Sequence, residues 1–357
     1  MKITLYRDPA DLKHTIDAWE SLYRCHGNRS PATSPRYCLL ALEHARREEA
    51  SPLVIAASRD GELVGIWPMW LVRERRLTVG RHVGIGSNEE YAEPLAADTE
   101  AMEAMLDAAL ALCDVLAINN VRSDSLLLRR KLGWLSHKTP ILSPVTRCGA
   151  APSWEAWLAE RTRNFRQSLR GQRRKLEKQG VTHIGAVRRV EIDDFVEWMI
   201  ETKCRWLSNR SKKIAGWLQQ PESWRFVKAA LADPRSKLVG HAISLDGQYI
   251  AGALCLSGSV HEYMITAYDP AFASFSPGHV LTGHCVEQAI ADGSDFDFRI
   301  THDAYKLRWI DDYDRRYSLI IASTVRAMPM LVRLYFASLR KWQSTVRKAL
   351  LKKIRAR

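Results

Sequence analysis

The sequence has little of what membrane-spanning and disulfide-stabilised proteins need. It contains no run of about 18 uninterrupted apolar residues, and its first residues lack the long apolar segment of a signal peptide. We therefore expect a cytoplasmic protein, either free in the cytoplasm or peripherally bound to the inner face of the membrane. Its seven cysteines are odd in number, scattered along the chain, and form no C-x-x-C motif or His/Cys cluster at metal-ligand spacing. We interpret them as buried thiols and expect no disulfide scaffold and no metal site.

Short catalytic motifs are also missing. No nucleophile elbow, P-loop, dinucleotide-binding fingerprint or metal-binding motif occurs in the 357 residues. Hydrolases, kinases, dehydrogenases and metalloenzymes therefore lack support, which favours a transferase. The composition, with 46% hydrophobic and 26% charged residues, is that of a globular protein rather than a disordered one. Because one hydrophobic core rarely serves a chain of this length, we expect two domains.

Positive charge concentrates in two segments. Residues 160–189 contain ten basic and two acidic residues, and residues 331–357 contain nine basic residues and no acidic one. Since the whole chain carries only +13, the remainder is mildly acidic, and these two surfaces are the expected anion contacts. The second segment spaces its apolar residues three or four apart, which predicts a basic amphipathic helix. Such a helix either docks on the core or lies on an anionic membrane or on nucleic acid.

Two segments of the chain repeat one pattern. Residues 52–72 and 237–256 each predict a strand, an Asp-Gly turn and a second strand. Both hairpins follow helical stretches, at residues 12–25 and 35–47 in the first copy and at residues 192–207 and 221–232 in the second. Both precede another strand, a loop, a helix and a final strand. We therefore predict an α/β protein made of two copies of one unit, residues 1–145 and 146–325, followed by a helical tail, residues 326–357.

The start of a helix in the second copy has the clearest site chemistry. Residues 261–268 predict a strand and residues 269–275 a loop, after which Ser276, Pro277 and Gly278 open a helix. We expect the Ser276 hydroxyl to cap this helix and its backbone N–H groups to point outward. Such donors, together with the helix dipole, suit a phosphate or pyrophosphate.

Several further short segments occur in a particular order. They are residues 60–68, 91–95, 166–176, 203–207, 267–270, 276–278 and 297–309. In this order and spacing the chain resembles the GCN5-related N-acetyltransferase (GNAT) fold, in which a strand-loop-helix binds the pyrophosphate of acyl-coenzyme A. The likeness is closer to the cellulose-biosynthesis-type, BioF2-like acetyltransferases and more distant to the FemABX aminoacyltransferases, in which the fold is duplicated. It spans about residues 1–325 and implies a tandem GNAT fold with a mixed sheet and an acyl-coenzyme A donor.

The resemblance also implies where the donor binds. Coenzyme A would contact Ser276, Pro277, Gly278 and His279. Residues 81–86, Arg-His-Val-Gly-Ile-Gly, fit a second pyrophosphate pattern of the superfamily, but that pattern requires a helix directly after its last glycine. Pro94 interrupts the segment that follows, so we interpret residues 81–86 as a glycine-rich strand end.

Acyl transfer from a thioester needs a base, donors for the oxyanion and an acid for the leaving thiolate. Asp303 is the candidate base, with His302 as its competitor. Tyr305 is the candidate acid, and Lys306 would hold the oxyanion or an anionic group of the acceptor. His302 is alternatively a solvated loop residue, Tyr305 a core residue with a satisfied hydroxyl, and Lys306 a surface ion-pair partner of Asp303 or Asp311.

Six further residues are candidates for substrate binding. Arg166, Arg170 and Arg174 lie at helical spacing and would clamp phosphate groups of the donor or acceptor, unless they form a solvated basic face. Lys203 and Trp206 lie three apart on one predicted helix and would face the cleft, although Trp206 is equally a core candidate. Tyr91 completes the set that the resemblance supplies.

These observations favour acyl transfer from acyl-coenzyme A to an amine or hydroxyl of a cell-envelope or polysaccharide-related acceptor, without a metal ion. A second interpretation is an aminoacyl-tRNA-dependent transferase of FemABX type, in which the basic segments contact tRNA. A third is a non-catalytic adaptor that uses the tail as a membrane or RNA anchor.

Overall fold

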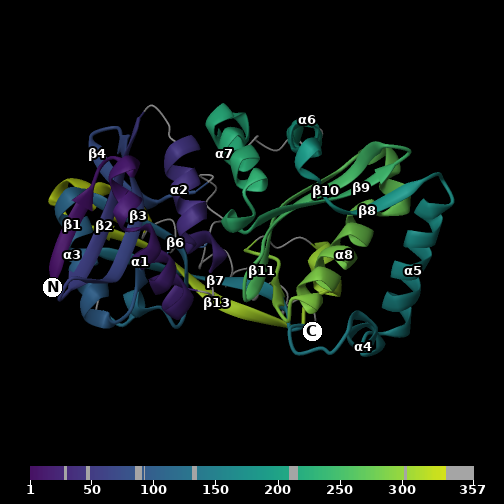
Figure 1. Ribbon diagram of the computed structural model, residues 1–357, viewed down its shortest axis with the longest axis horizontal. Coiled ribbons are helices and arrows are strands. Elements are labelled where there is room, and N and C mark those ends of the chain that lie inside the picture. Colours follow the sequence, from purple (N-terminus) through teal and green to yellow (C-terminus); the bar gives the residue numbers. More distant parts are fainter. Residues whose placement is uncertain are drawn as a thin grey trace, which may run out of the picture.

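Figure 1 shows one mixed sheet running through the whole molecule, with helices on both of its faces. This computed structural model describes residues 1–27, 30–45, 49–84, 91, 93–130, 135–208, 216–300 and 304–334. The strand order in the sheet is β1-β2-β3-β4-β6-β13-β7-β12-β11-β10-β9-β8, and β5 pairs with β3 at the side of this path.

Among the described residues, the first half of the chain contains seven strands and three α-helices. Its strands are β1 (Lys2–Tyr6), β2 (Ala50–Arg59), β3 (Glu62–Glu74), β4 (Leu77–His82), β5 (Leu95–Ala96), β6 (Val115–Arg122) and β7 (Ser136–Thr146). Its α-helices are α1 (Ile16–Leu22), α2 (Pro35–His44) and α3 (Thr99–Leu112), and a 3-10 turn at Pro9–His14 precedes α1.

The second half repeats this order after two additional helices. Its strands are β8 (Thr182–Ala186), β9 (Leu238–Leu245), β10 (Gln248–Leu256), β11 (Val260–Tyr268), β12 (Asp295–Asp297) and β13 (Asp312–Ala322). Its helices are α4 (Trp154–Ala159), α5 (Arg163–Glu177), α6 (Ile192–Ser208), α7 (Pro221–Ala232) and α8 (Pro277–Ala291).

The strand pairing confirms the predicted duplication. In each half four strands run antiparallel, β1 to β4 and β8 to β11, and the fourth pairs in parallel with the strand that follows a helix. The final strands are exchanged between the halves, because β13 pairs with β6 and β7 pairs with β12. β7 and β13 also pair with each other along ten residues, from Asp312 opposite Val145 to Ile321 opposite Ser136. The exchange joins both halves in one sheet.

Both predicted hairpins turn at their Asp-Gly pairs. The φ angles of Asp60 and Gly61 are 51° and 87°, and those of Asp246 and Gly247 are 49° and 83°. Two successive positive φ angles define the type I′ turn, whose twist matches that of the flanking strands. Asp and Gly tolerate this backbone, which is why the dipeptide marks the turn in the sequence.

The helices of both halves pack into one shared core on one face of the sheet. α1 and α2 of the first half meet α6 and α7 of the second, and α2 and α7 stand side by side in Figure 1. The rings of Tyr37 and Phe226 meet edge to face at 5.0 Å, and Arg36 pairs with Asp233. On the opposite face, α3 covers the first half, and α4, α5 and α8 cover the second.

Some predictions of local structure need correction. The expected helix over residues 12–25 is divided into the 3-10 turn at Pro9–His14, α1 and a π-helical turn at Tyr23–Gly27. The expected loop at residues 269–275 contains a 3-10 turn, Pro270–Phe275. Of the seven cysteines, Cys25 is exposed and Cys204 partly exposed, so only five are buried thiols. Residues 85 and 86 of the 81–86 pattern lie outside the described residues. Most of the predicted tail helix also lies outside them.

Among the residues that the structure describes, no helix has both the length and the apolar character that crossing a bilayer requires.

Two glycines give opposite expectations for replacement by alanine. At Gly149 a Cβ would lie 2.9 Å from the Gly293 carbonyl oxygen, and this backbone cannot move aside cheaply. We expect Gly149→Ala to lower the free energy of unfolding by about 1–3 kcal/mol. At Gly171, inside α5, a Cβ meets nothing within 4 Å, so Gly171→Ala should raise the free energy of unfolding by about 0.5–1 kcal/mol. Urea denaturation measures both; equal effects of the two replacements would contradict the packing at Gly149.

Candidate active site

The candidate site lies where two parallel strands of the second half separate. β11 and β12 pair only from Val260 opposite Asp295 to Glu262 opposite Asp297. Beyond this point β12 ends, whereas β11 continues to Tyr268. The chain leaves β12 through Phe298 and Arg299 and returns as a 3-10 turn at Ala304–Arg308. Beyond Glu262, the edge of β11 that faces β12 has no paired strand among the described residues.

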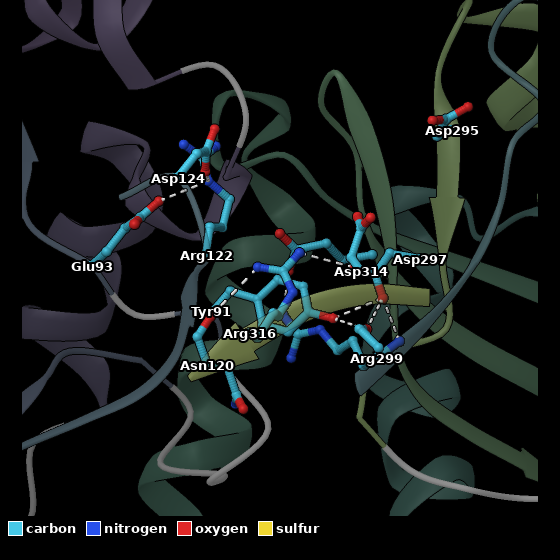
Figure 2. A network of polar contacts seen from close by, with 12 residues as sticks. Tyr91, Glu93, Asn120, Arg122, Asp124, Asp295, Asp297, Arg299, Asp314 and Arg316 are labelled. Atoms are coloured by element: carbon cyan, nitrogen blue, oxygen red, sulfur yellow. Dashed lines mark hydrogen bonds and ion pairs between the residues drawn. The ribbon is translucent and has the colours of Figure 1, made fainter. Parts of the chain in front are cut away.

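A buried carboxylate, Asp297, binds groups from both halves of the chain. Its Oδ1 accepts hydrogen bonds from the Tyr91 hydroxyl at 2.7 Å, the Ser143 hydroxyl at 2.6 Å and the Arg299 backbone N–H at 2.6 Å. Its Oδ2 accepts from the Arg316 guanidinium at 3.0 Å. Figure 2 shows Tyr91, Asp297, Arg299 and Arg316 converging at this point. Because burial of an unpaired charge is costly, these four donors hold the carboxylate in place.

Two guanidinium groups flank the Tyr91 ring. The guanidinium carbon of Arg316 lies 3.3 Å from the ring centroid and that of Arg299 lies 5.0 Å from it. Arg299 also pairs with Glu262, and both side chains are almost completely buried. Burial raises the pKa of Tyr91 well above its ordinary value, and the neighbouring Asp297 raises it further. Tyr91 is therefore a neutral hydroxyl donor within a network of two carboxylates and two guanidinium groups.

Lys306 is tied to the same strand end. It is buried, and its Nζ donates a hydrogen bond of 2.6 Å to the carbonyl oxygen of Phe298, the residue after Asp297. Tyr305, its neighbour, is 40% exposed. The structure thus places a buried amine and a solvent-facing phenol side by side on the 3-10 turn.

A contact between aromatic rings joins this turn to the start of α8. The Trp309 indole N–H donates to Nδ1 of His279 at 3.2 Å, and the two rings are 4.9 Å apart. Phe165, at the start of α5, packs against Trp309 at 4.9 Å and against His279 at 5.7 Å. The turn that carries Tyr305 and Lys306 is therefore connected to the start of α8 through the contact of Trp309 with His279.

The start of α8 differs from the prediction at Ser276. This residue adopts a left-handed backbone, φ 53° and ψ 50°, and its side chain makes no capping hydrogen bond. The preceding 3-10 turn, Pro270–Phe275, ends at Ser276, and the left-handed residue joins it directly to α8. The carbonyl of Ser276 accepts hydrogen bonds from the backbone N–H groups of His279 and Val280, and Pro277 at the first helical position has no N–H.

The three candidate arginines of α5 have different surroundings. Arg166 donates to the carbonyl oxygens of Ala159 and Arg161, at 2.8 and 2.7 Å, and so fixes the connection between α4 and α5. Arg170 is exposed, and Arg174 is exposed with its Nε 3.3 Å from the carbonyl oxygen of Arg170. Arg170 and Arg174 thus remain on a solvated basic face, whereas Arg166 has a structural use.

Lys203 and Trp206 share one face of α6, as predicted. The Lys203 Nζ lies 5.1 Å from the Trp206 ring centroid and donates to the carbonyl oxygen of Thr266 at 2.8 Å. However, α6 packs on the face of the sheet opposite to α8. Neither residue is therefore brought to the contact between Trp309 and His279. Two other candidates, His302 and Asp303, lie outside the described residues.

Sequence analysis assigned no role to several residues at the centre of this site. They are Ser143, Glu262, Asp297, Arg299, Trp309 and Arg316. One signal was present, because Glu262 is a charged residue inside the predicted strand of residues 261–268. Its partner Arg299 is more than thirty residues away in sequence, so no spacing could pair them.

A cavity of about 240 Å³ lies on the first-half side of the network. Its walls include Glu93, Leu95, Met102, Arg122 and Ser125. Arg122 pairs with Glu93 at 3.3 Å and with Asp124 at 3.1 Å, as Figure 2 shows, and stands opposite Arg316 in the sheet. A charged cavity wall therefore adjoins the buried network.

Comparison with known proteins places this geometry in a fold family. A model of the acetyltransferase (GNAT) domain matches residues 163–307, less than half of the chain. The solved structure of FemX superposes with a TM-score of 0.60 at 12% identity, covering 92% of this chain and 99% of that one. A tandem GNAT protein from the clavulanic acid biosynthesis pathway gives a TM-score of 0.51 at 9% identity, covering 90% and 99%. The chain has a tandem GNAT fold.

A third structure widens this fold comparison. The C-terminal domain of a putative lysylphosphatidylglycerol synthetase from Agrobacterium fabrum gives a TM-score of 0.57 at 10% identity, covering 91% of this chain and 95% of that chain. No curated protein sequence matches this chain significantly. In the tandem GNAT fold seen here, the second copy contains both α8 and the Lys306 turn, so the candidate site belongs to that copy.

Removing the Tyr91 hydroxyl tests the network between the halves. Tyr91→Phe deletes a buried hydrogen bond to Asp297 and should lower the free energy of unfolding by about 1–3 kcal/mol, since the carboxylate loses a donor that water cannot replace. Tyr313→Phe on β13, where the side chain is 40% exposed, is the control and should change it by less than about 0.5 kcal/mol. Guanidinium denaturation provides the measurement. Equal stability of Tyr91→Phe and the natural protein would contradict this role.

Titration of His279 should make the protein sensitive to acid. Burial lowers the pKa of His279 to about 4, so the folded state binds this proton at lower pH than the unfolded chain does. The contribution of neutral His279 to the free energy of unfolding is complete above the ordinary histidine pKa of about 6.5. It is lost as the pH falls toward about 4, because the unfolded chain then binds a proton that the folded state does not. His279→Gln keeps an acceptor for Trp309 but does not titrate, so its stability should fall less over this interval.

The measurement is the urea midpoint as a function of pH. The exposed His14, replaced by Gln, serves as the control and should follow the natural protein. A His279→Gln variant with the same pH profile as the natural protein would show that His279 does not titrate in this way.

Proposed function

We propose that this protein is an acyltransferase that moves an acyl group from acyl-coenzyme A to an amine or hydroxyl of a cell-envelope or polysaccharide-related acceptor, as in the cellulose-biosynthesis-type acetyltransferases. The observation that carries the proposal is the position of Lys306. Its buried amine is held at the divergence of β11 and β12, next to the turn that meets the start of α8. The GNAT-domain match over residues 163–307 includes β11, β12, the start of α8 and Lys306, and it ends two residues before Trp309.

Lys306 fits the electrostatic demand of acyl transfer. As the acceptor attacks the acyl carbonyl, negative charge develops on the carbonyl oxygen, and a fixed cation with N–H donors stabilises it. An ammonium has three donors, and the Phe298 carbonyl takes one of them. That bond fixes the direction of the side chain in advance, so little reorganisation accompanies the reaction.

Tyr305 is the proposed acid on the leaving group. Its ring is partly exposed on the same 3-10 turn, within reach of a ligand that enters from solvent. When the tetrahedral intermediate collapses, the phenol donates its proton to the departing thiolate. The acceptor nitrogen or oxygen loses its proton to a base, for which Asp303 and His302 remain the sequence-based proposals.

The donor is proposed to bind at the start of α8. Gly278 lies in the first turn of α8, where free N–H groups and the helix dipole favour a pyrophosphate. The residue is partly exposed, and a Cβ there would lie no closer than 3.7 Å to Tyr268. His279, directly behind it, connects this segment to Trp309 and the Lys306 turn.

A second candidate is an aminoacyl-tRNA-dependent transferase of FemABX type. The specific observation is the α5 surface, on which Arg170 and Arg174 are exposed and make no ion pair within the described part of the chain. A face of this kind suits the phosphate backbone of a nucleic acid. The fold similarity to FemX extends over 99% of that chain and is compatible with this donor.

Donor binding and turnover separate these proposals. We expect an acyl-coenzyme A of one preferred chain length to raise the melting temperature, since a ligand at about 100 times its Kd adds about 2.7 kcal/mol of stability. Lys306→Met keeps the aliphatic packing and removes the charge. It should retain this shift but lose about 100-fold or more of the coenzyme A thiol release that an acceptor amine stimulates.

The control is Lys138→Met, which removes an exposed lysine that stacks on Tyr317 of β13. It should keep both the shift and the turnover. Unchanged turnover in folded Lys306→Met would refute the role of Lys306. No stabilisation by any acyl-coenzyme A, together with steeply salt-dependent tRNA binding that Arg170→Glu weakens, would favour the second candidate.

A further inference from the structure

Three metal-ligating side chains meet between the sheet and α8, away from the candidate active site. They are His241 on β9, Cys255 on β10 and Cys285 on α8, and all three are buried. One ligand atom of each lies within 4.8 Å of the others. In sequence these residues are 14 and 30 positions apart, so no short motif contains them.

The strand register explains why they face one another. His241 stands opposite Ala253 in the pairing of β9 with β10, and Cys255 lies two residues further along β10. Side chains two apart on a strand share a face, so His241 and Cys255 both point to the side that α8 covers. Cys285 lies on the buried side of α8 in the same core cluster as Cys255.

The bonding of these groups differs from that of the other buried cysteines. Cys38, Cys113 and Cys148 each donate to a backbone carbonyl oxygen. Cys285 instead has Cys255 as its hydrogen-bond partner. His241 is only 5% exposed, and its Nδ1 is a buried atom with no hydrogen-bond partner among the described residues. The cluster therefore contains a buried ligand atom that no described group hydrogen-bonds, which is uncommon for a buried polar atom.

We propose that His241, Cys255 and Cys285 bind a zinc ion. Thiolate and imidazole are the ligands that zinc prefers. On binding, each thiol releases its proton to solvent as its sulfur bonds to the metal. Two thiolates then balance the charge of Zn²⁺, and the neutral complex suits an apolar core.

His284 is the neighbour best placed to complete the coordination. Its ring lies 5.2 Å from that of His241, and its Nε2 is also buried without a hydrogen-bond partner in the described structure. A neutral imidazole has a lone pair available for a metal.

The ion would fix α8 to β9 and β10 two helical turns from Pro277. This site is structural, because the contact between Trp309 and His279 involves none of its ligands. The inference therefore does not depend on the proposed acyl transfer.

Metal content of the purified full-length protein tests the proposal. We expect one zinc per chain by inductively coupled plasma mass spectrometry after purification without chelators, and a lower melting temperature after zinc is removed. Cys255→Ser and Cys285→Ser should each reduce bound zinc by about tenfold or more, because each removes one of the thiolate ligands. Cys113→Ser, an equally buried cysteine in the first half, is the matched control and should keep its zinc.

Cobalt provides a measurement that does not depend on how the variants fold. Zinc-free natural protein titrated with Co²⁺ should develop thiolate-to-cobalt charge-transfer absorption that saturates at one equivalent. Blocking the thiols of the natural zinc protein with a mercurial should release the metal. Natural protein that contains no zinc and gives no such absorption overturns the proposal, as does equal zinc loss in Cys113→Ser. Isolation of a Cys255–Cys285 disulfide from freshly purified protein would overturn it as well.

Discussion

The arrangement of the two halves depends on one buried carboxylate. Asp297 accepts hydrogen bonds from Tyr91 and Ser143 of the first half and from Arg299 and Arg316 of the second. Each donor comes from a different segment of the chain, and the carboxylate has no access to water. If the halves moved relative to each other, a charge would lose its partners inside the protein, which is among the most expensive changes a fold can undergo. The network therefore acts as a rigid joint.

The exchange of β7 and β13 makes this joint possible. Ser143 lies on β7 and Arg316 on β13, and these strands run next to each other between the two parallel strand pairs. The same exchange brings Lys306 near the seam, since its partner Phe298 follows Asp297 directly. The candidate catalytic turn is thus anchored to the buried network that joins the two halves.

α8 connects the two sites that we propose. Its first residues carry the proposed donor contact, and its middle carries Cys285 of the proposed zinc cluster. Phe165 and Trp309 pack beside the start of the helix, whereas His241 and Cys255 face its centre from the sheet. A helix held at its centre keeps its N-terminal amides in a constant position, which is what binding an extended anionic ligand requires.

The repeated unit, the Asp-Gly hairpins and most of the helices could be predicted from the sequence. They follow from hydrophobic periodicity, turn chemistry and short motifs, all of which act over a few residues. The folded structure was needed to reveal the strand exchange, the left-handed backbone at Ser276, the backbone contacts of Arg166 and the pairing of Tyr91 with Asp297. It also brought His241, Cys255 and Cys285 together. Each of these depends on contacts between residues far apart in the chain, and such contacts are selected by the need to satisfy buried polar groups in one packed arrangement.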